Sequence, residues 1–284
     1  MSDTTQDRKI TLVLGGTGKT GSRVAQKLTA RGLPVRIGSR SAERPFDWED
    51  PDTWAPALAD VGSVYIAYQP DLAFPGAAAT VGSFARLAVE RGARRLVLLS
   101  GRNEVGAQLA EQEVQASGAA WTVVRSSFFA QNFSEGPWAD SIVSGEFAVP
   151  AGDVTEPFID VDDIADVVVA ALTDDAHVGR LYEVTGPRLM TFGDVAAAIS
   201  AATGRDVRYR PVSSAEFAAG LRAEGLPDEL VDGLTDLFAE VLDGRSSSLA
   251  DGVQRALGRP PRDFADYARR AAAAGRWSRQ RANV

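Results

Sequence analysis

An α/β protein built on a doubly wound parallel sheet is predicted from three features of the sequence. Short apolar strands alternate with helical patterns through the first half of the 284 residues, which is the arrangement that produces such a sheet. One of these strands, residues 95–100, is almost wholly apolar, as expected of a strand buried on both faces. The first strand also leads directly into a run of glycines and a helix. The second half predicts a smaller, mostly helical C-terminal substrate domain.

The glycine run is the most informative segment of the chain. Residues 10–14 fit a buried strand, and glycines then follow at GxxGxxG spacing over residues 15–21, where a helical pattern begins. Glycine turns let backbone N–H groups approach a phosphate, and the helix dipole adds positive charge there. The segment therefore predicts a dinucleotide bound through its pyrophosphate. A nucleoside-triphosphate loop is excluded, because that loop would need a glycine at Val13.

The residues after the second strand indicate whether the dinucleotide is NAD(H) or NADP(H). A site for NAD(H) usually has an acidic residue there, which binds the ribose hydroxyls. Here the strand at residues 34–38 is followed by Ser39 and Arg40, and Glu43 comes three residues too late. A hydroxyl and a guanidinium would bind a 2′-phosphate that a carboxylate would repel, so the sequence favours NADP(H). The alternative is that Arg40 is an ordinary solvated charge.

Composition narrows the classes of function. The net charge is -8, yet the first 44 residues carry nine Lys or Arg and three acids, which suits a multiply charged anionic ligand and not nucleic acid. The sequence has no membrane-length apolar run, no signal-like N-terminal segment and no cysteine. We therefore expect a cytoplasmic monomer or homodimer that acts on a small molecule, with no nucleic-acid, membrane or metal partner. The single histidine, His177, is expected at the surface.

The elements of the first half follow in a regular order. Apolar residues at helical spacing predict helices that include residues 24–28, 53–58, 81–88 and 106–117. Apolar runs predict further strands at residues 35–37, 64–67 and 121–125. Residues 46–48 fit either a short strand or a turn. Together these elements predict a dinucleotide-binding domain over residues 1–150.

The second half contains shorter elements. Strands are predicted at residues 157–159, 181–184 and 207–210. Asp162 is expected to cap a helix that runs to Leu172, and residues 191–194 form a capping-box pattern before another helix. From Ser213 the chain is predicted to be helical, with breaks near residues 225–227, 244 and 258–261. We expect residues 157–185 to return to the sheet and residues 186–284 to form a smaller substrate or lid domain.

A long connection between the two halves is rich in aromatic residues. Residues 126–137 follow the last strand of the first half, at the edge of the sheet where ligands bind in such folds. This position predicts substrate contacts from Phe129, Asn132, Phe133 and Trp138. The aromatic rings could equally seal a junction between domains, because they bury large apolar areas.

Several segments together resemble the NmrA-like, atypical branch of the short-chain dehydrogenase/reductases. Within it, the chain looks most like ergot-alkaloid-pathway reductases and triphenylmethane-reductase-like proteins. The resemblance covers nearly the whole chain and is carried by residues 13–21, 46–48, 98–100, 121–133 and 158–164.

The resemblance implies a Rossmann domain and a set of cofactor contacts. The pyrophosphate would lie against Gly15, Thr17, Gly18, Lys19, Thr20 and Gly21, and the adenine-ribose phosphate against Ser39 and Arg40. The nicotinamide end would be bordered by Tyr68, Gln69, Pro70, Ser100 and Phe128.

The chain departs from most short-chain reductases at the catalytic pair. Those enzymes use Tyr-x-x-x-Lys, in which the lysine lowers the pKa of the tyrosine so that it can act as an acid. The three lysines here are Lys9, Lys19 and Lys27, all before the second strand, so none can complete the pair. Tyr68 is the first candidate proton donor and Ser100 the second.

The missing pair favours one kind of chemistry. A ketone becomes an alkoxide on reduction and needs a proton donor or an oxyanion site, whereas an iminium or cationic quinonoid accepts hydride without either. We therefore expect an NADPH-dependent reductase of a small conjugated or C=N-containing compound, of the kind found in secondary metabolism. A non-catalytic NADP(H) sensor and a non-redox isomerase or hydrolase remain alternatives. Asp160, Asp162 and Asp163 could serve in acid–base chemistry, although helix capping is the favoured interpretation.

Overall fold

A computed structural model describes residues 9–278, which divide into two compact units. The first unit contains residues up to 126 together with 162–183 and 252–259. The second contains residues 127–161 and 184–251 and those from 260 onward. Residues 127–150, expected in the dinucleotide-binding domain, thus cluster with the second unit, because their aromatic side chains pack into its core.

The first unit contains a six-stranded sheet with the order β2-β1-β3-β4-β5-β8. In chain order these strands are β1 (Ile10–Leu14), β2 (Val35–Gly38), β3 (Val61–Ile66), β4 (Arg95–Gly101), β5 (Ala120–Ser126) and β8 (Arg180–Val184). The pairs from β2 to β5 are parallel. Strand β8 follows the same direction, since the Gly179 N–H donates to the Trp121 carbonyl and the Ser127 N–H to that of Val184. The predicted doubly wound sheet is confirmed.

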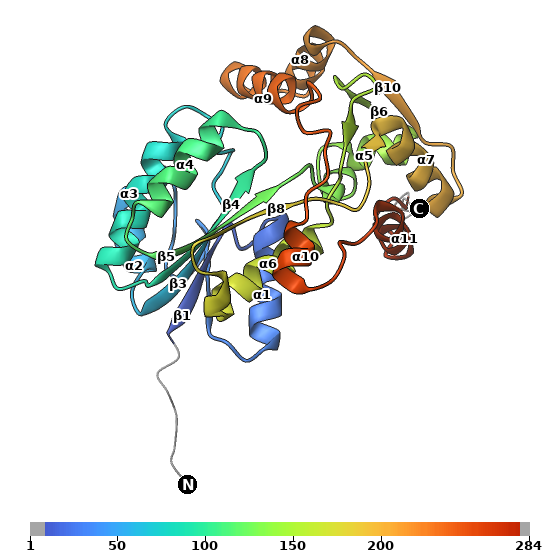
Figure 1. Ribbon diagram of the computed structural model, residues 1–284. Helices are drawn as coiled ribbons and strands as arrows, with labels where there is room; N and C mark the ends of the chain where they lie inside the picture. The colour runs from blue at the N-terminus through green and yellow to red at the C-terminus, as the bar shows by residue number, and fades with distance from the viewer. Residues whose placement is uncertain (1–8, 279–284) are drawn as a thin grey trace, which may run out of the picture. The chain divides into compact units, whose positions relative to one another are not determined.

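Helices cover both faces of this sheet (Figure 1). One face carries α2 (Trp54–Ala57), α3 (Ala77–Glu90) and α4 (Val105–Gln115), and the other α1 (Lys19–Ala30), α6 (Val161–Thr173) and α10 (Gly252–Leu257). Alternate residues of each strand face opposite layers. Leu12, Val64 and Leu96 therefore belong to the apolar core under α2 to α4, while the intervening Val13 and Tyr65 face the α1 layer.

Two local predictions in the first half are refined. Residues 46–48 form no strand; Phe46 and Trp48 instead pack edge to face, with ring centroids 4.9 Å apart, in the core under α3. The following helix starts as a 3-10 turn, Pro51–Thr53, and Asp50 caps it by accepting from the Asp52 N–H. Aromatic packing thus takes the place of a strand at residues 46–48.

The second unit combines short strands with helices. Its elements are α5 (Trp138–Ser144), β6 (Glu146–Val149), β7 (Thr155–Glu156), β9 (Met190–Thr191), α7 (Phe192–Thr203), β10 (Arg208–Pro211), α8 (Ser214–Ala223), α9 (Asp228–Val241) and α11 (Phe264–Ala273). Strands β6 and β10 pair in parallel, and β7 and β9 antiparallel. The capping box of Thr191 and Asp194 is confirmed, whereas the strand predicted at 157–159 is reduced to a single bridge from Ile159 to Phe129.

His177 is buried, so the expectation that it lies at the surface is wrong. Its backbone lies in a short 3-10 helix, Asp175–His177, where the carbonyl of His177 accepts from the Thr122 hydroxyl. The ring is buried as well, and its Nδ1 lies 2.8 Å from the Tyr182 hydroxyl oxygen. The polar composition of the loop indicated exposure, but the loop packs against the sheet through contacts that the composition does not show.

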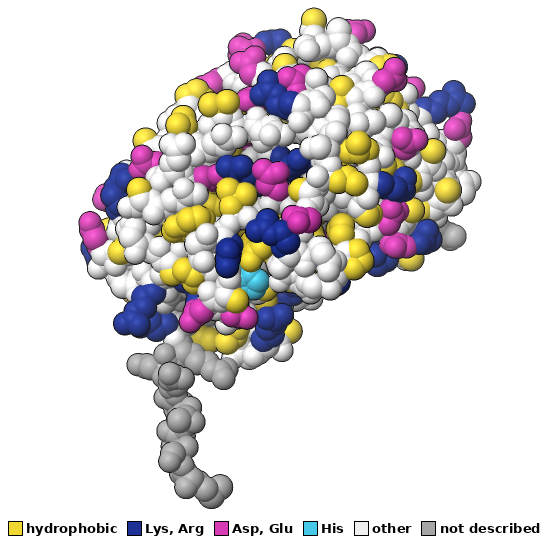
Figure 2. All heavy atoms as spheres, viewed as in Figure 1, with side chains coloured by type: hydrophobic (Ala, Val, Ile, Leu, Met, Phe, Trp, Pro, Cys, Tyr) yellow, Lys and Arg dark blue, Asp and Glu magenta, His cyan; other side chains and the backbone are white. Residues whose placement is uncertain are grey.

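The surface carries both signs of charge. On the face drawn in Figure 2, Lys and Arg side chains alternate with Asp and Glu and form no continuous basic stripe. Among residues 9–278, no helix combines the length and apolarity needed to cross a membrane.

Candidate functional site

The glycine turn between β1 and α1 is shaped for an anion. Gly15 has φ +61°, a backbone conformation that favours glycine, and its carbonyl accepts from the Gly18 N–H at 2.9 Å. A Cβ at Gly21 would lie 2.3 Å from the Gly15 carbonyl oxygen, so α1 can begin this close to the turn only with glycine there. Helix α1 has no side-chain cap and no acidic residue in its first turn. Its N–H groups and dipole therefore suit the pyrophosphate of a dinucleotide.

The turn lies at the point where the chain order of the sheet reverses. From β1 the chain goes to β2 on one side and then to β3 on the other, and ligands of open α/β sheets bind at the carboxyl ends of strands at such a point. Leu14 pairs in register with Gly38, so Gly15 and Ser39 leave the sheet at the same edge. Arg40 follows as an exposed side chain, and within residues 9–278 it forms no hydrogen bond or ion pair.

The segment after β3 supplies a half-exposed aromatic side chain. Tyr68 packs against Trp48, with ring centroids 5.0 Å apart, and its hydroxyl has no hydrogen-bond partner among the described residues. Gln69 and Pro70 follow as exposed residues joined by a cis peptide bond. Asp71 comes next, and burial raises the pKa of its carboxyl.

Ser100 lies at the carboxyl end of β4, where it contacts a buried carboxylate. The hydroxyl of Ser100 donates to Glu111 Oε1 at 2.6 Å. Glu111 comes from α4, is 2% exposed, and also accepts from Arg125 Nε and Nη2, both at 2.6 Å. Both oxygens of this carboxyl group therefore accept hydrogen bonds from a guanidinium fork, in the geometry of a bidentate Arg–carboxylate pair. The hydroxyl proton of Ser100 is therefore held by Glu111.

Arg125 has a second acidic partner. Its Nη1 donates to Glu183 Oε1 at 3.2 Å, and Arg102 Nε lies 3.4 Å from the other oxygen of Glu183. The hydrogen bond to Glu111 makes the largest contribution to raising the pKa of the Arg125 guanidinium, and the hydrogen bond to Glu183 and its negative charge raise it further. The charges of two arginines and two glutamates thus balance at the carboxyl ends of β4, β5 and β8.

The aromatic loop lies in the second unit. Phe133 is fully buried and Trp138 is 7% exposed, with ring centroids 5.6 Å apart. Phe128, Phe129 and Asn132 are half-buried. Phe133 and Trp138 thus form part of the core of this unit, and a direct role of any of the five in ligand binding stays a prediction.

The three acidic residues before and within α6 each contact a cation. Buried Asp160 accepts from Gln131 Nε2 at 2.8 Å and from Arg270. Asp163 pairs with Arg259 at 2.7 Å, and Asp162 lies 3.7 Å from Arg23. Two of the acids also stand in the first turn of α6, where negative charge is favoured. These contacts support a structural role for the cluster.

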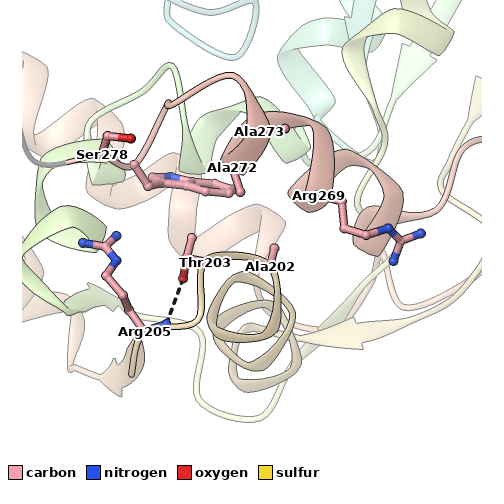
Figure 3. Close-up of a pocket in the computed structure, with 8 residues that line it drawn as sticks. Ala202, Thr203, Arg205, Arg269, Ala272, Ala273 and Ser278 are labelled. Atoms are coloured by element: carbon pink, nitrogen blue, oxygen red, sulfur yellow. Dashed lines mark hydrogen bonds between the residues drawn. The ribbon is translucent and has the colours of Figure 1, made fainter.

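A separate hollow of about 640 Å³ lies in the second unit (Figure 3). It is bounded by α7, α11 and the residues that follow α11, and Arg205, Arg269 and Trp277 are among the residues that line it. None of the residues predicted to bind cofactor or substrate lines it.

Sequence reasoning overlooked the pairing of Glu111 with Arg125, although a signal was present. Ala107, Ala110 and Val114 mark the buried side of α4, and Glu111 falls on that side by helical spacing. Arg125 is the penultimate residue of β5, a strand that is mostly apolar. A buried acid and a charge in a central strand indicate a buried ion pair, because either would be costly alone.

The fold and the glycine turn define a dinucleotide-binding protein of the Rossmann class. Residues 15–175 match a family described as NAD(P)H-binding, and residues 108–250 match the NmrA-like family. The chain belongs to the NmrA-like family of NAD(P)-binding, atypical short-chain dehydrogenase/reductases. It is an NAD(P)-dependent oxidoreductase.

Several named relatives of the chain are reductases or dehydrogenases. It is 34% identical to the NAD(P)H azoreductase of Xenophilus azovorans over 93% of this chain and 98% of the relative. It is 33% identical to the agroclavine dehydrogenase of Claviceps fusiformis over 90% of this chain and 95% of the relative. Among solved structures, the Citrobacter sp. triphenylmethane reductase complexed with NADP(H) superposes with a TM-score of 0.73 at 18% identity, over 93% and 99% of the two chains, which shows a shared fold.

Proposed function

We propose that the protein is an NADPH-dependent reductase of a small conjugated or C=N-containing substrate, such as an iminium or quinone-like compound. The observation that carries this proposal is the hydrogen bond that the Ser100 hydroxyl donates to Glu111. A ketone oxygen would need a proton from Ser100 or from a Tyr–Lys pair, but Glu111 holds the serine proton and the sequence lacks the pair. An iminium carbon accepts hydride and becomes a neutral amine without a proton donor.

Each group of residues has a role in this proposal. The turn at Gly15–Gly21 holds the pyrophosphate, and Ser39 and Arg40 hold the 2′-phosphate. NADPH, when bound, supplies the hydride.

Ser100 offers a hydrogen-bond acceptor, because its own proton is directed to Glu111. Tyr68, whose hydroxyl has no partner in the described part of the chain, is the proposed proton donor for quinone-like substrates, because reduction of a quinone leaves negative charge on an oxygen that is much less basic than the alkoxide of a ketone. The aromatic loop, with Phe128, Phe129 and Asn132, is proposed to border the nicotinamide and substrate.

Replacing Arg40 with alanine is expected to weaken NADPH binding by about 10- to 100-fold, because one charge-assisted contact to the 2′-phosphate is lost. Binding of NADH, which lacks that phosphate, should change by less than about twofold. Cofactor fluorescence titrations of the native protein and the variant measure both constants. Arg44→Ala is a matched control for loss of a neighbouring loop charge. Equal weakening of NADPH and NADH would contradict the assignment of Arg40.

A substrate panel tests the reaction. Loss of NADPH absorbance is followed with an iminium salt, a quinone, an azo dye and a simple ketone matched in shape to the iminium. We expect kcat/KM for the iminium or quinone to exceed that for the ketone by about 100-fold or more, the usual effect of a missing oxyanion donor. Comparable turnover of the ketone would contradict the proposal, and so would no NADPH oxidation with any member of the panel.

The role of Tyr68 is tested with the same panel. In Tyr68→Phe, kcat for the quinone should fall about tenfold or more relative to kcat for the iminium, because only the quinone gains negative charge on oxygen. A uniform fall for both substrates would assign Tyr68 to packing against Trp48 instead.

A further inference from the structure

Tyr65 carries a buried hydroxyl with no hydrogen-bond partner. It lies near the end of β3 in the middle of the sheet, paired in register with Val13 and Val97, and is completely buried. Its hydroxyl oxygen makes no hydrogen bond with any described residue, and burial raises the pKa of the phenol. A buried hydroxyl without a partner destabilises a folded protein, so an unpaired one next to a binding site suggests a function.

The phenol faces the glycine turn. Ala67 lies two residues further on, just after the end of β3, and its Cβ is 3.4 Å from a Cβ built on Gly15, so alternation along the chain directs Tyr65 toward the same side. Thr20, in the first turn of α1, lies beside the phenol and opposes part of the rise in its pKa. The two hydroxyls nevertheless do not form a hydrogen bond of standard geometry.

Thr20 is placed to connect the phenol with the anion site. It is 6% exposed and stands in the uncapped first turn of α1, and its hydroxyl makes no other hydrogen bond within residues 9–278. Each hydroxyl is a donor, and the positive end of α1 lies at the same place. An oxyanion would accept from the Thr20 hydroxyl and from the N–H groups at the helix end, and would leave the Thr20 oxygen to accept from Tyr65.

We propose that Tyr65 is a positioning residue for the cofactor pyrophosphate: its hydroxyl donates to Thr20, and Thr20 in turn donates to a phosphate oxygen. The inference rests on the proposed NADPH site and deepens it. Because the pair is incomplete without the anion, the protein loses stability in the free state and recovers it on binding. The side chain of Tyr65 does not touch the phosphate itself and acts through Thr20.

Tyr65→Phe separates this role from simple packing. In the absence of cofactor the variant should melt about 2–4 °C higher than the native protein, because an unpaired buried hydroxyl is removed. Its Kd for NADPH should nevertheless rise about three- to tenfold. Thr20→Val should weaken binding to a similar extent, and Thr20→Ser should restore it to within about twofold.

The double variant and a control complete the test. If Tyr65 acts through Thr20, adding Tyr65→Phe to Thr20→Val should change Kd by less than about twofold. Tyr209→Phe is the matched control, since the Tyr209 hydroxyl donates to the carbonyls of Val149 and Gly152 at 3.2 Å. It should lower the melting temperature and leave Kd for NADPH unchanged.

Two results would overturn the inference. One is an unchanged Kd for NADPH in Tyr65→Phe. The other is a double variant in which the fold-increase in Kd equals the product of the fold-increases in the two single variants. Either can be observed only if the native protein binds NADPH. Failure of the native protein to bind would instead remove the proposed function, so the two failures are distinguishable.

Discussion

Replacing Gly21 with alanine should severely weaken NADPH binding. The added Cβ would lie 2.3 Å from the Gly15 carbonyl oxygen and 2.7 Å from its carbonyl carbon. Both are backbone atoms, so the clash can be relieved only if α1 moves away from the glycine turn. Its first N–H groups would then no longer point at the pyrophosphate. We expect Kd for NADPH to rise by about 100-fold or more, which corresponds to roughly 2.8 kcal/mol of binding free energy. Fluorescence titration measures the change.

Gly220→Ala is the matched control for Gly21→Ala. Gly220 lies within α8, and a Cβ there would have no heavy atom within 4 Å. Alanine should stabilise that helix by about 0.5–1 kcal/mol and leave cofactor binding unchanged. If Gly21→Ala bound NADPH as tightly as Gly220→Ala, the close approach of α1 to the glycine turn would have no importance for the site.

Replacing Glu111 with alanine should cause the second large effect. Arg125, whose side chain is 21% exposed, would lose its bidentate partner, and the hydroxyl of Ser100 would lose its acceptor. Removing one member of a buried ion pair costs about 3–5 kcal/mol, and the partial exposure of Arg125 favours the lower end. Urea denaturation of the native protein and the variant measures the difference in the free energy of unfolding.

Glu113→Ala provides the comparison for Glu111→Ala. Glu113 lies two residues away on α4 and pairs with Arg86 at 2.7 Å, but both side chains are about half exposed at 42% and 52%. Loss of such a surface pair should cost less than about 1 kcal/mol. Equal destabilisation by the two substitutions would show that the Glu111–Arg125 contact contributes no more than a surface ion pair.

The parts of the site that could be predicted from the sequence are local in the chain. The glycine turn depends on backbone conformation and close approach within seven residues, so its spacing alone indicates an anion site. Ser39 and Arg40 follow a strand whose end is clear from its apolar run. The sheet was predictable for the same reason, because each strand–helix repeat is a local pattern with a known handed connection.

The parts that escaped prediction depend on contacts between distant segments. Glu111 meets Ser100 and Arg125 only because β4 and β5 pair with Ser100 opposite Arg125. The loop of His177 is bound to the sheet by the hydroxyl of Thr122, 55 residues earlier. Tyr65 looked like an ordinary strand residue, since no pattern shows that its hydroxyl faces α1 without a partner. Whether a polar atom is buried depends on which helices and strands pack around it, and a local sequence pattern does not predict that packing.

The interleaved path of the chain has a consequence for attempts to separate the units. Each unit is composed of three stretches of sequence, so no single cut releases either one whole. Ending the chain after β5 would remove β8 and α6, and would leave the backbone N–H and C=O groups of β5 unpaired along one edge. An open edge of this kind recruits other chains into aggregates. Fragments of this protein should therefore precipitate where the full chain stays dissolved, and biosynthesis must reach residue 259 before the first unit can be completed.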